Sequence, residues 1–295
     1  MFNIIEKRNI FFAISIVLIL AGIIAMIICG GLEQSVDFAG GTTMHINMKN
    51  TFDNQEVADL VKETIGKEPS SVQKAGDQQA EVIISMQTID TETRNKLFEA
   101  FKTKYSLEQE DLLSVDNVEP TVGNELKFQA FLSTLIASIL MLVYISFRFE
   151  FKSGVAAVIA LIHDVLIMIS AYAILRIPVS TSFIAAILTI LGYSINDTIV
   201  IFDRIRENNK VMRKEPFADV VNTSIWQTIS RSKMTSLTTL LTITALYILG
   251  VPSIKDFALP IIIGLIAGTY SSIFIASPIW VMWREAERKK KLKTA

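Results

Sequence analysis

The sequence contains one cysteine and two histidines. A single cysteine, Cys29, excludes a disulfide within the chain and any metal cage built from several thiolates. We expect it to be a small buried residue. Neither a glycine-rich phosphate loop nor a His-Glu-x-x-His zinc motif occurs. We therefore expect no nucleotide, metal or other cofactor, no enzymatic site and no nucleic-acid partner.

Apolar residues, by contrast, are abundant: 51% of the 295 residues are hydrophobic and the mean hydropathy is +0.45. This is too apolar for an ordinary soluble domain and predicts an α-helical integral membrane protein with one polar insert. The first apolar run lacks a small-x-small cleavage site, so we interpret it as a retained transmembrane helix. Six runs have the length needed to cross a bilayer, namely residues 10–29, 128–147, 154–175, 182–203, 234–250 and 257–282.

The basic residues of the short loops indicate how these six helices are oriented. Most Lys and Arg lie on one side, and the short loops opposite hold only Arg176 and Lys255. Because basic loops stay in the cytoplasm, both termini are predicted to be cytoplasmic. The resulting segments are residues 1–29 (N-terminus and first helix), 30–127 (an outer domain), 128–283 (helices two to six, with a cytoplasmic loop at 204–233) and 284–295 (a basic tail).

The outer domain is predicted to be small and folded. Its patterns indicate strands at 42–48, 71–75, 81–86 and 112–118, a helix between Asp53 and Gly66, and a second helix at 91–105. This β-α-β-β-α-β order is the ferredoxin-like arrangement. His45, on the first strand, is expected to be solvated. The domain is joined to the membrane helices through predicted hinges, which are Gly40, Gly41 and Gly123.

The fourth apolar run carries an unusual charge. From Phe183 to Phe202 the only charged residue is Asp197. A charge at the bilayer centre costs at least about 2.5–3.5 kcal/mol on insertion scales, so it should face protein or water. At about 100° per residue, Asp197 falls in a polar stripe with Asn196 and Gly192. The pattern favours an ion or proton site, with a hydrogen-bonded structural carboxylate as the alternative.

Other intramembrane polar residues extend this picture. Arg231, Thr235 and Thr238 project to one side of the fifth run, where the hydroxyls either bond back to their own helix or face water or Asp197. His163 and Asp164 in the third run suit either proton movement or packing.

In the sixth run small residues recur every four positions, which permits close helix contact. These residues are Gly264, Gly268 and Ser272.

Taken together, these stretches resemble the SecF subunits of bacterial SecDF, within the RND superfamily. The matching segments are 36–42 (VDFAGGT), His163-Asp164, 192–208 (GYSINDTIVIFDRIREN), Ser230-Arg231 with 235–241, and 268–272. The chain departs from the family pattern at Ser232-Lys233. The resemblance implies one half of an RND-like bundle in the bacterial cell membrane.

The resemblance also implies partners and a mechanism. The expected partners are SecD, the SecYEG translocon, the translocating polypeptide, membrane lipid and, as a candidate further subunit, YajC. The family's proton-carrying carboxylate matches Asp197, and Arg231 matches an arginine beside the pathway. Protonation of Asp197 is expected to repack helices four and five and tilt the outer domain. The coupling ion is expected to be the proton, with Na⁺ as the alternative.

Three other functions compete with this one. A proton-driven RND exporter of small molecules is the main alternative, although such chains usually carry larger outer domains. An intramembrane aspartyl protease using Asp164 and Asp197 would need a Gly-x-Gly-Asp loop, which is absent. A purely structural anchor would tolerate Asp197→Asn.

Overall fold

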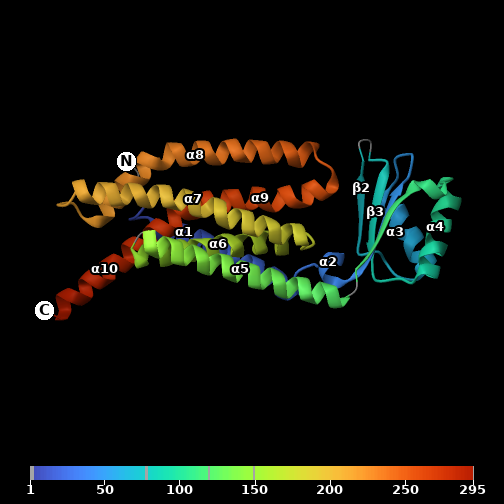
Figure 1. The fold of residues 1–295 in the computed structure, drawn as a ribbon, viewed down its shortest axis with the longest axis horizontal. Coiled ribbons are helices and arrows are strands. Elements are labelled where there is room, and N and C mark those ends of the chain that lie inside the picture. The colour runs from blue at the N-terminus through green and yellow to red at the C-terminus, as the bar shows by residue number, and fades with distance from the viewer. Residues whose placement is uncertain (1–2, 77–78, 119, 149, 295) are drawn as a thin grey trace.

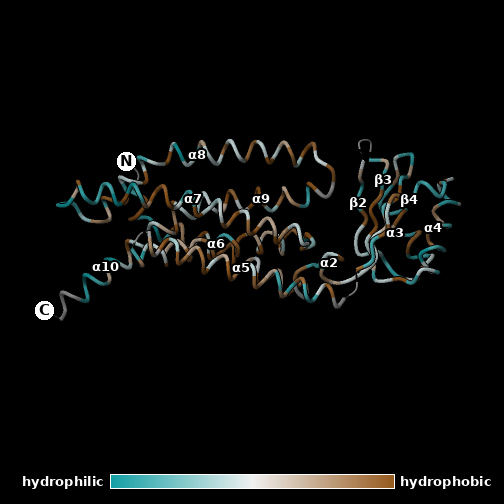
Figure 2. Tube along the Cα trace, viewed as in Figure 1, coloured by the Kyte–Doolittle hydropathy of each residue, from teal (hydrophilic) through white to brown (hydrophobic). Residues whose placement is uncertain are grey.

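The computed structural model describes all residues except 1–2, 77–78, 119, 149 and 295. A long helical bundle forms one part of the molecule and a small sheet domain the other, with both labelled termini at the bundle end away from the sheet (Figure 1). Apolar residues dominate the bundle, whereas the far end of α10 is hydrophilic (Figure 2). Cys29, predicted to be buried, is exposed just beyond the first helix.

Long helices build the bundle. They are α1 (Arg8–Ile28), α5 (Pro120–Arg148), α6 (Phe151–Leu175), α7 (Thr181–Val211), α8 (Phe217–Leu249), α9 (Pro252–Ser271) and α10 (Ser277–Thr294), with one π-helical turn, η2 (Ser272–Ala276), between the last two. Within the described chain, five helical segments are long and apolar enough to cross a membrane: Arg8–Ile28, Val122–Ile145, Phe151–Leu175, Thr181–Val211 and Ile254–Lys290.

The predicted fifth span, 234–250, lies in α8, which is not among those five segments. Its threonine and serine hydroxyls lower its hydropathy, although α8 packs along α7 and α9 like a bundle helix.

The predicted loop at 204–233 is mostly helical. Helix α7 continues to Val211 and α8 begins at Phe217, which leaves only 212–216 outside the two helices. Side chains join the two extensions, because Asn208 Nδ2 donates to Ser224 Oγ at 2.9 Å and to Gln227 Oε1 at 2.8 Å. The polar residues of this segment suggested a loop, but the helix is amphipathic here and buries one face, including Ile205 and Asn208.

The sheet domain follows the predicted element order closely. Its strands are β1 (Gly41–Asn47), β2 (Ser71–Ala75), β3 (Glu81–Met86) and β4 (Leu112–Val118), and its helices are α3 (Asn54–Ile65), α4 (Thr91–Tyr105) and the 3₁₀ turn η1 (Gln109–Asp111). All pairings are antiparallel in the order β2-β3-β1-β4. Alternate β1 residues, Met44 and Ile46, enter the core beneath α3 and α4.

Local signals explain why these elements start and stop where they do. The Asp53 side chain accepts from Gln55 N at 2.7 Å, and Gly66 closes α3 in the left-handed region. His45 is partly exposed, as expected of a solvated histidine, but it also has a protein partner. Its Nε2 lies 2.8 Å from Glu81 Oε2 on the neighbouring strand, a cross-strand pairing that spacing along the sequence does not reveal.

Candidate functional site

Asp197 is buried where α7 faces α8, with 6% of its surface exposed. Ser232 of α8, fully buried, lies beside the carboxylate, and the Arg231 guanidinium acts on it through its charge. In the described part of the chain, neither Asp197 Oδ2 nor Ser232 Oγ has a hydrogen bond of good geometry. A buried polar atom left without a partner costs about 1–3 kcal/mol. The bundle therefore holds a carboxylate that its own packing does not satisfy.

The polar stripe drawn from the sequence is divided in the structure. Asp197 is buried, whereas Asn196, Gly192 and Thr189 are exposed on the outer face of α7. Adjacent residues on a helix are separated by about 100°, and the edge of the buried face falls between residues 196 and 197. Asn196 thus lies on a small, polar face that this chain leaves uncovered.

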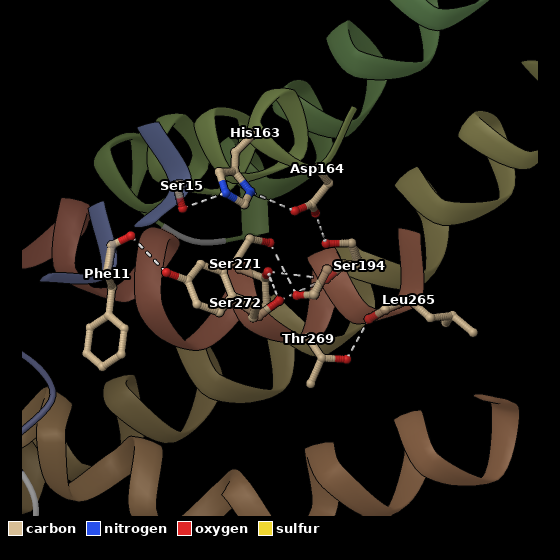
Figure 3. Close-up of polar contacts among 12 residues, drawn as sticks. Phe11, Ser15, His163, Asp164, Ser194, Leu265, Thr269, Ser271 and Ser272 are labelled. Atoms are coloured by element: carbon tan, nitrogen blue, oxygen red, sulfur yellow. Dashed lines mark hydrogen bonds and ion pairs between the residues drawn. The ribbon is translucent and has the colours of Figure 1, made fainter. Parts of the chain in front are cut away.

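A second buried acid, Asp164 of α6, is held by a network from three helices (Figure 3). Ser194 Oγ of α7 donates to Asp164 Oδ2 at 2.6 Å, and His163 Nδ1 lies 3.1 Å from Asp164 Oδ1. The other ring nitrogen, His163 Nε2, lies 2.9 Å from Ser15 Oγ of α1. With the proton on Nδ1, the ring donates to the carboxylate and accepts from the serine. The sequence does not reveal Ser15 and Ser194 as partners, because only tertiary pairing brings them to the acid.

Small residues let α9 approach α7 closely beside this network. A Cβ atom added at Gly264 would lie 2.5 Å from Ile190 Cγ1, and one at Gly268 would lie 2.9 Å from Ser194 Cβ. Real Cβ contacts do not come this close, so both positions require glycine at the present helix separation. Gly268 therefore leaves room for Ser194, the residue that donates to Asp164.

The π-helical turn begins one helical turn further along the same contact. Ser272 Oγ lies 2.8 Å from Thr198 Oγ1, next to Asp197 in sequence, and also donates to Ser194 O at 3.4 Å. Single π turns occur often at functional sites. This one connects the surroundings of both buried acids.

The threonines of α8 do not turn toward Asp197. Thr235 and Thr238 are exposed, and their hydroxyls donate to carbonyl oxygens one turn back on α8, at 3.0 Å (Arg231 O) and 2.9 Å (Met234 O). This geometry is the back-bonding alternative raised by the sequence. Arg231 is also exposed, so these side chains continue the uncovered face of α7 onto α8.

The predicted hinge glycines have different structural roles. Gly40 has φ 73° and ψ 154°, a conformation open essentially to glycine alone. Gly41 lies against Met86 O, 2.4 Å from where its Cβ would be. Gly123 lies inside α5, where a Cβ would be 2.6 Å from Phe38 O. It is therefore a packing position for the short helix α2 (Val36–Ala39) and not a turn.

The segment between α1 and the sheet domain is fastened to the start of α7, which the sequence did not reveal. Asp37 Oδ2 accepts from Thr181 N at 3.0 Å and from Thr181 Oγ1 at 2.8 Å. Ser35 N donates to Val179 O at 2.9 Å. Asp197 lies on the same helix, and residues 181 to 197 span about 24 Å at 1.5 Å per residue. One helix thus joins the unsatisfied carboxylate to the tether of the sheet domain.

Comparisons with known proteins agree with this architecture. Residues 97–286 match the family described as "Protein export membrane protein SecD/SecF, C-terminal". The chain is 38% identical to protein translocase subunit SecF of Alicyclobacillus acidocaldarius over 98% of its own length and 95% of that protein. It is also 38% identical to protein translocase subunit SecDF of Bacillus subtilis, over 97% of this chain and 38% of that protein.

The solved structures that this chain resembles are also SecDF proteins. The SecDF crystal structure from Thermus thermophilus matches with a TM-score of 0.85 and 37% identity over 96% of this chain and 39% of the other. SecDF in its super-membrane-facing form matches with a TM-score of 0.75 and 36% identity, over 100% of this chain and 40% of the other.

The helical bundle, its buried carboxylates and its small antiparallel sheet thus define a membrane protein with several apolar helices. The chain belongs to the SecD/SecF family of protein export membrane proteins. It spans nearly the whole length of its SecF relative and under two fifths of its SecDF relative. The names of these relatives do not favour the small-molecule exporter.

Proposed function

We propose that this chain is the SecF-type accessory subunit of a Sec translocase, acting with a SecD-type partner to complete polypeptide export through SecYEG by using the proton motive force. The observation that carries the proposal is Asp197, a buried carboxylate with an oxygen that lacks a hydrogen bond in the described chain. Its helix also holds the tether of the sheet domain through Asp37.

The proposed architecture has six spans, with α8 as the fifth, and both termini in the cytoplasm. The hydroxyls of α8 that bond to its own carbonyls support this, because such bonding reduces the cost of placing threonine in a membrane. The sheet order β2-β3-β1-β4, with helices after β1 and β3, supports a ferredoxin-like domain outside the membrane.

In the proposed cycle, a proton binds Asp197 and removes its charge. The attraction between the Arg231 charge and the carboxylate is then lost, the surroundings of Ser232 change, and α7 shifts against α8. Because Asp37 is bonded to the first residue of α7, this shift moves the tether and tilts the sheet domain. Each proton that descends the potential releases about 2.3 kcal/mol per 100 mV. This is comparable with the few kcal/mol that separate conformational states of a protein.

The exposed face of α7 and α8 is the proposed contact with the SecD-type partner. It carries small and polar residues (Gly192, Asn196, Thr235 and Thr238) that lipid would solvate poorly. The SecDF relatives support this pairing by their names and by their greater length. SecYEG, YajC and the exported polypeptide are the further proposed partners, with the proton as the coupling ion.

The test is Asp197→Asn in a bacterium whose own SecF is depleted, scored by pulse-chase export of a slow-folding secreted protein. We expect export to fall to the level of the depleted strain, and collapse of the proton gradient to have little further effect. Asp219→Asn, an exposed acid on α8, is the matched control and should export normally. Normal export by the Asp197 variant at unchanged abundance would refute the proposal.

A further inference from the structure

A cavity of about 220 Å³ lies at the end of the bundle away from the sheet domain. Its walls come from three helices and one residue outside them: the last turns of α7, the first residue of α8, α10, and the residue that precedes α6. The residues that line it are Glu150, Ile205, Arg206, Asn209, Phe217, Trp280 and Arg284. The volume is far above the roughly 10–15 Å³ needed to hold one water molecule.

The lining combines charge with aromatic surface. The lining residues include two arginines, Arg206 and Arg284, and one acid, Glu150, so the formal charge of the lining is positive. The Arg284 guanidinium is held 4.0 Å above the Phe217 ring, which itself lies 5.5 Å from the Trp280 ring. A stacked guanidinium keeps its donors in a fixed direction, and such planar forks suit phosphate oxygens.

Apolar surface beside the cavity indicates what carries the phosphate. Phe151, next to Glu150 in sequence and at the start of the apolar helix α6, is 62% exposed. A free phosphate ion cannot bury this apolar surface, whereas acyl chains can. Residues of α7, α8 and α10 line the cavity, and Figure 2 shows the apolar helices giving way to the hydrophilic end of α10, the level at which headgroups meet membrane proteins.

We propose that this cavity binds the phosphodiester headgroup of a membrane phospholipid, with Arg206 and Arg284 as donors and the acyl chains lying along Phe151. The inference is independent of the proton site. The cavity lies at the end of the bundle that is proposed to be cytoplasmic, so the placement of the lipid in the cytoplasmic leaflet rests on the proposed function. The lipid would bind across the ends of α7, α8 and α10 and fix them relative to one another.

The test uses the purified full-length chain in detergent, titrated with dioctanoyl phosphatidylglycerol and followed by native mass spectrometry. Arg206→Gln and Arg284→Gln should each weaken binding at least about tenfold, the loss expected for one charge-assisted hydrogen bond. Arg288→Gln removes the same charge from an exposed position on α10 and should change binding less than twofold. Size-exclusion profiles will show whether each variant remains folded. Arg206 has an exposed side chain, so its variant remains informative if the Arg284 variant unfolds.

Two parallel titrations identify the source of the phosphate. Dioctanoylglycerol, which lacks the phosphate, should not bind at the site. Inorganic phosphate should bind at least about a hundredfold more weakly than the lipid, because it cannot use the apolar surface. Equal binding of inorganic phosphate and lipid would overturn the assignment to lipid. Unchanged lipid binding in both arginine variants would overturn the site itself.

Discussion

The contact between α7 and α9 allows a sharp test, because two glycines on these helices should respond oppositely to the same substitution. A Cβ added at Gly268 would lie 2.9 Å from Ser194 Cβ and 3.5 Å from its Cα. These atoms are fixed to the α7 backbone and cannot rotate away. A Cβ added at Gly192 on the exposed face of α7 meets nothing within 4 Å. Gly268→Ala therefore forces the helices apart, whereas Gly192→Ala does not.

The comparison isolates the packing cost. Replacing glycine by alanine inside a helix favours the helix by about 1 kcal/mol, and this gain is common to both variants. Overpacking at Gly268 costs about 1–3 kcal/mol more, so the free energies of unfolding should differ by about 1–3 kcal/mol, with Gly192→Ala the more stable. The assay is unfolding of the purified chain by sodium dodecyl sulfate, followed by far-ultraviolet circular dichroism. Equal midpoints for the two variants would show that α9 does not pack on α7 as described.

Three further predictions concern other parts of the chain. Hydrogen bonds from the backbone N–H of Glu108 and then from Lys49 lower the pKa of Asp111. The contribution of Asp111 to the free energy of unfolding should therefore be fully present above the unfolded pKa of about 3.9 and be lost as the pH falls through the folded pKa. Asp111→Asn should reduce this pH dependence in pH-jump unfolding. Asp37→Ala should speed amide hydrogen exchange at residues 179–183, since the Thr181 N–H loses the acceptor of a hydrogen bond worth about 1 kcal/mol; unchanged exchange would contradict the tether. Glu81→Gln should change the free energy of unfolding by less than about 0.5 kcal/mol, because the pairing of Glu81 with His45 is partly exposed.

The sheet domain could be predicted almost residue by residue because its signals are local. Asp53 and Gly66 mark the ends of α3, and strict alternation marks β1. The predicted bounds of β2, β3, β4 and α4 are confirmed. The pairing of His45 with Glu81 was not predicted, because Glu81 lies across the sheet rather than nearby along the chain.

The bundle was predicted as a set of apolar runs, but its contacts were not. Asp197 was identified by its charge in an apolar segment, which needs no knowledge of neighbouring helices. The partners of Asp164 could not be found in this way, because Ser15 and Ser194 are common residue types whose role depends on which helices meet. The same limitation placed Asn196 beside Asp197 on one stripe, when the edge of the buried face separates them.

The two buried acids should therefore respond differently to the same change. Both oxygens of Asp164 have partners, and an asparagine would present an amide N–H₂ either to the Ser194 hydroxyl or to His163 Nδ1. In either orientation both hydrogen bonds change from charge-assisted bonds to bonds with a neutral amide, which are roughly half as strong, so Asp164→Asn should lower the free energy of unfolding by about 1–3 kcal/mol.

Asp197 has an oxygen without a partner among the residues described, so Asp197→Asn should leave unfolding within about 1 kcal/mol while removing the titratable group. Detergent unfolding and pulse-chase export, measured on both variants, separate a structural acid from a working one. If Asp197→Asn unfolds as readily as Asp164→Asn, its lost export reflects misfolding, and the case for a mobile proton at this position fails.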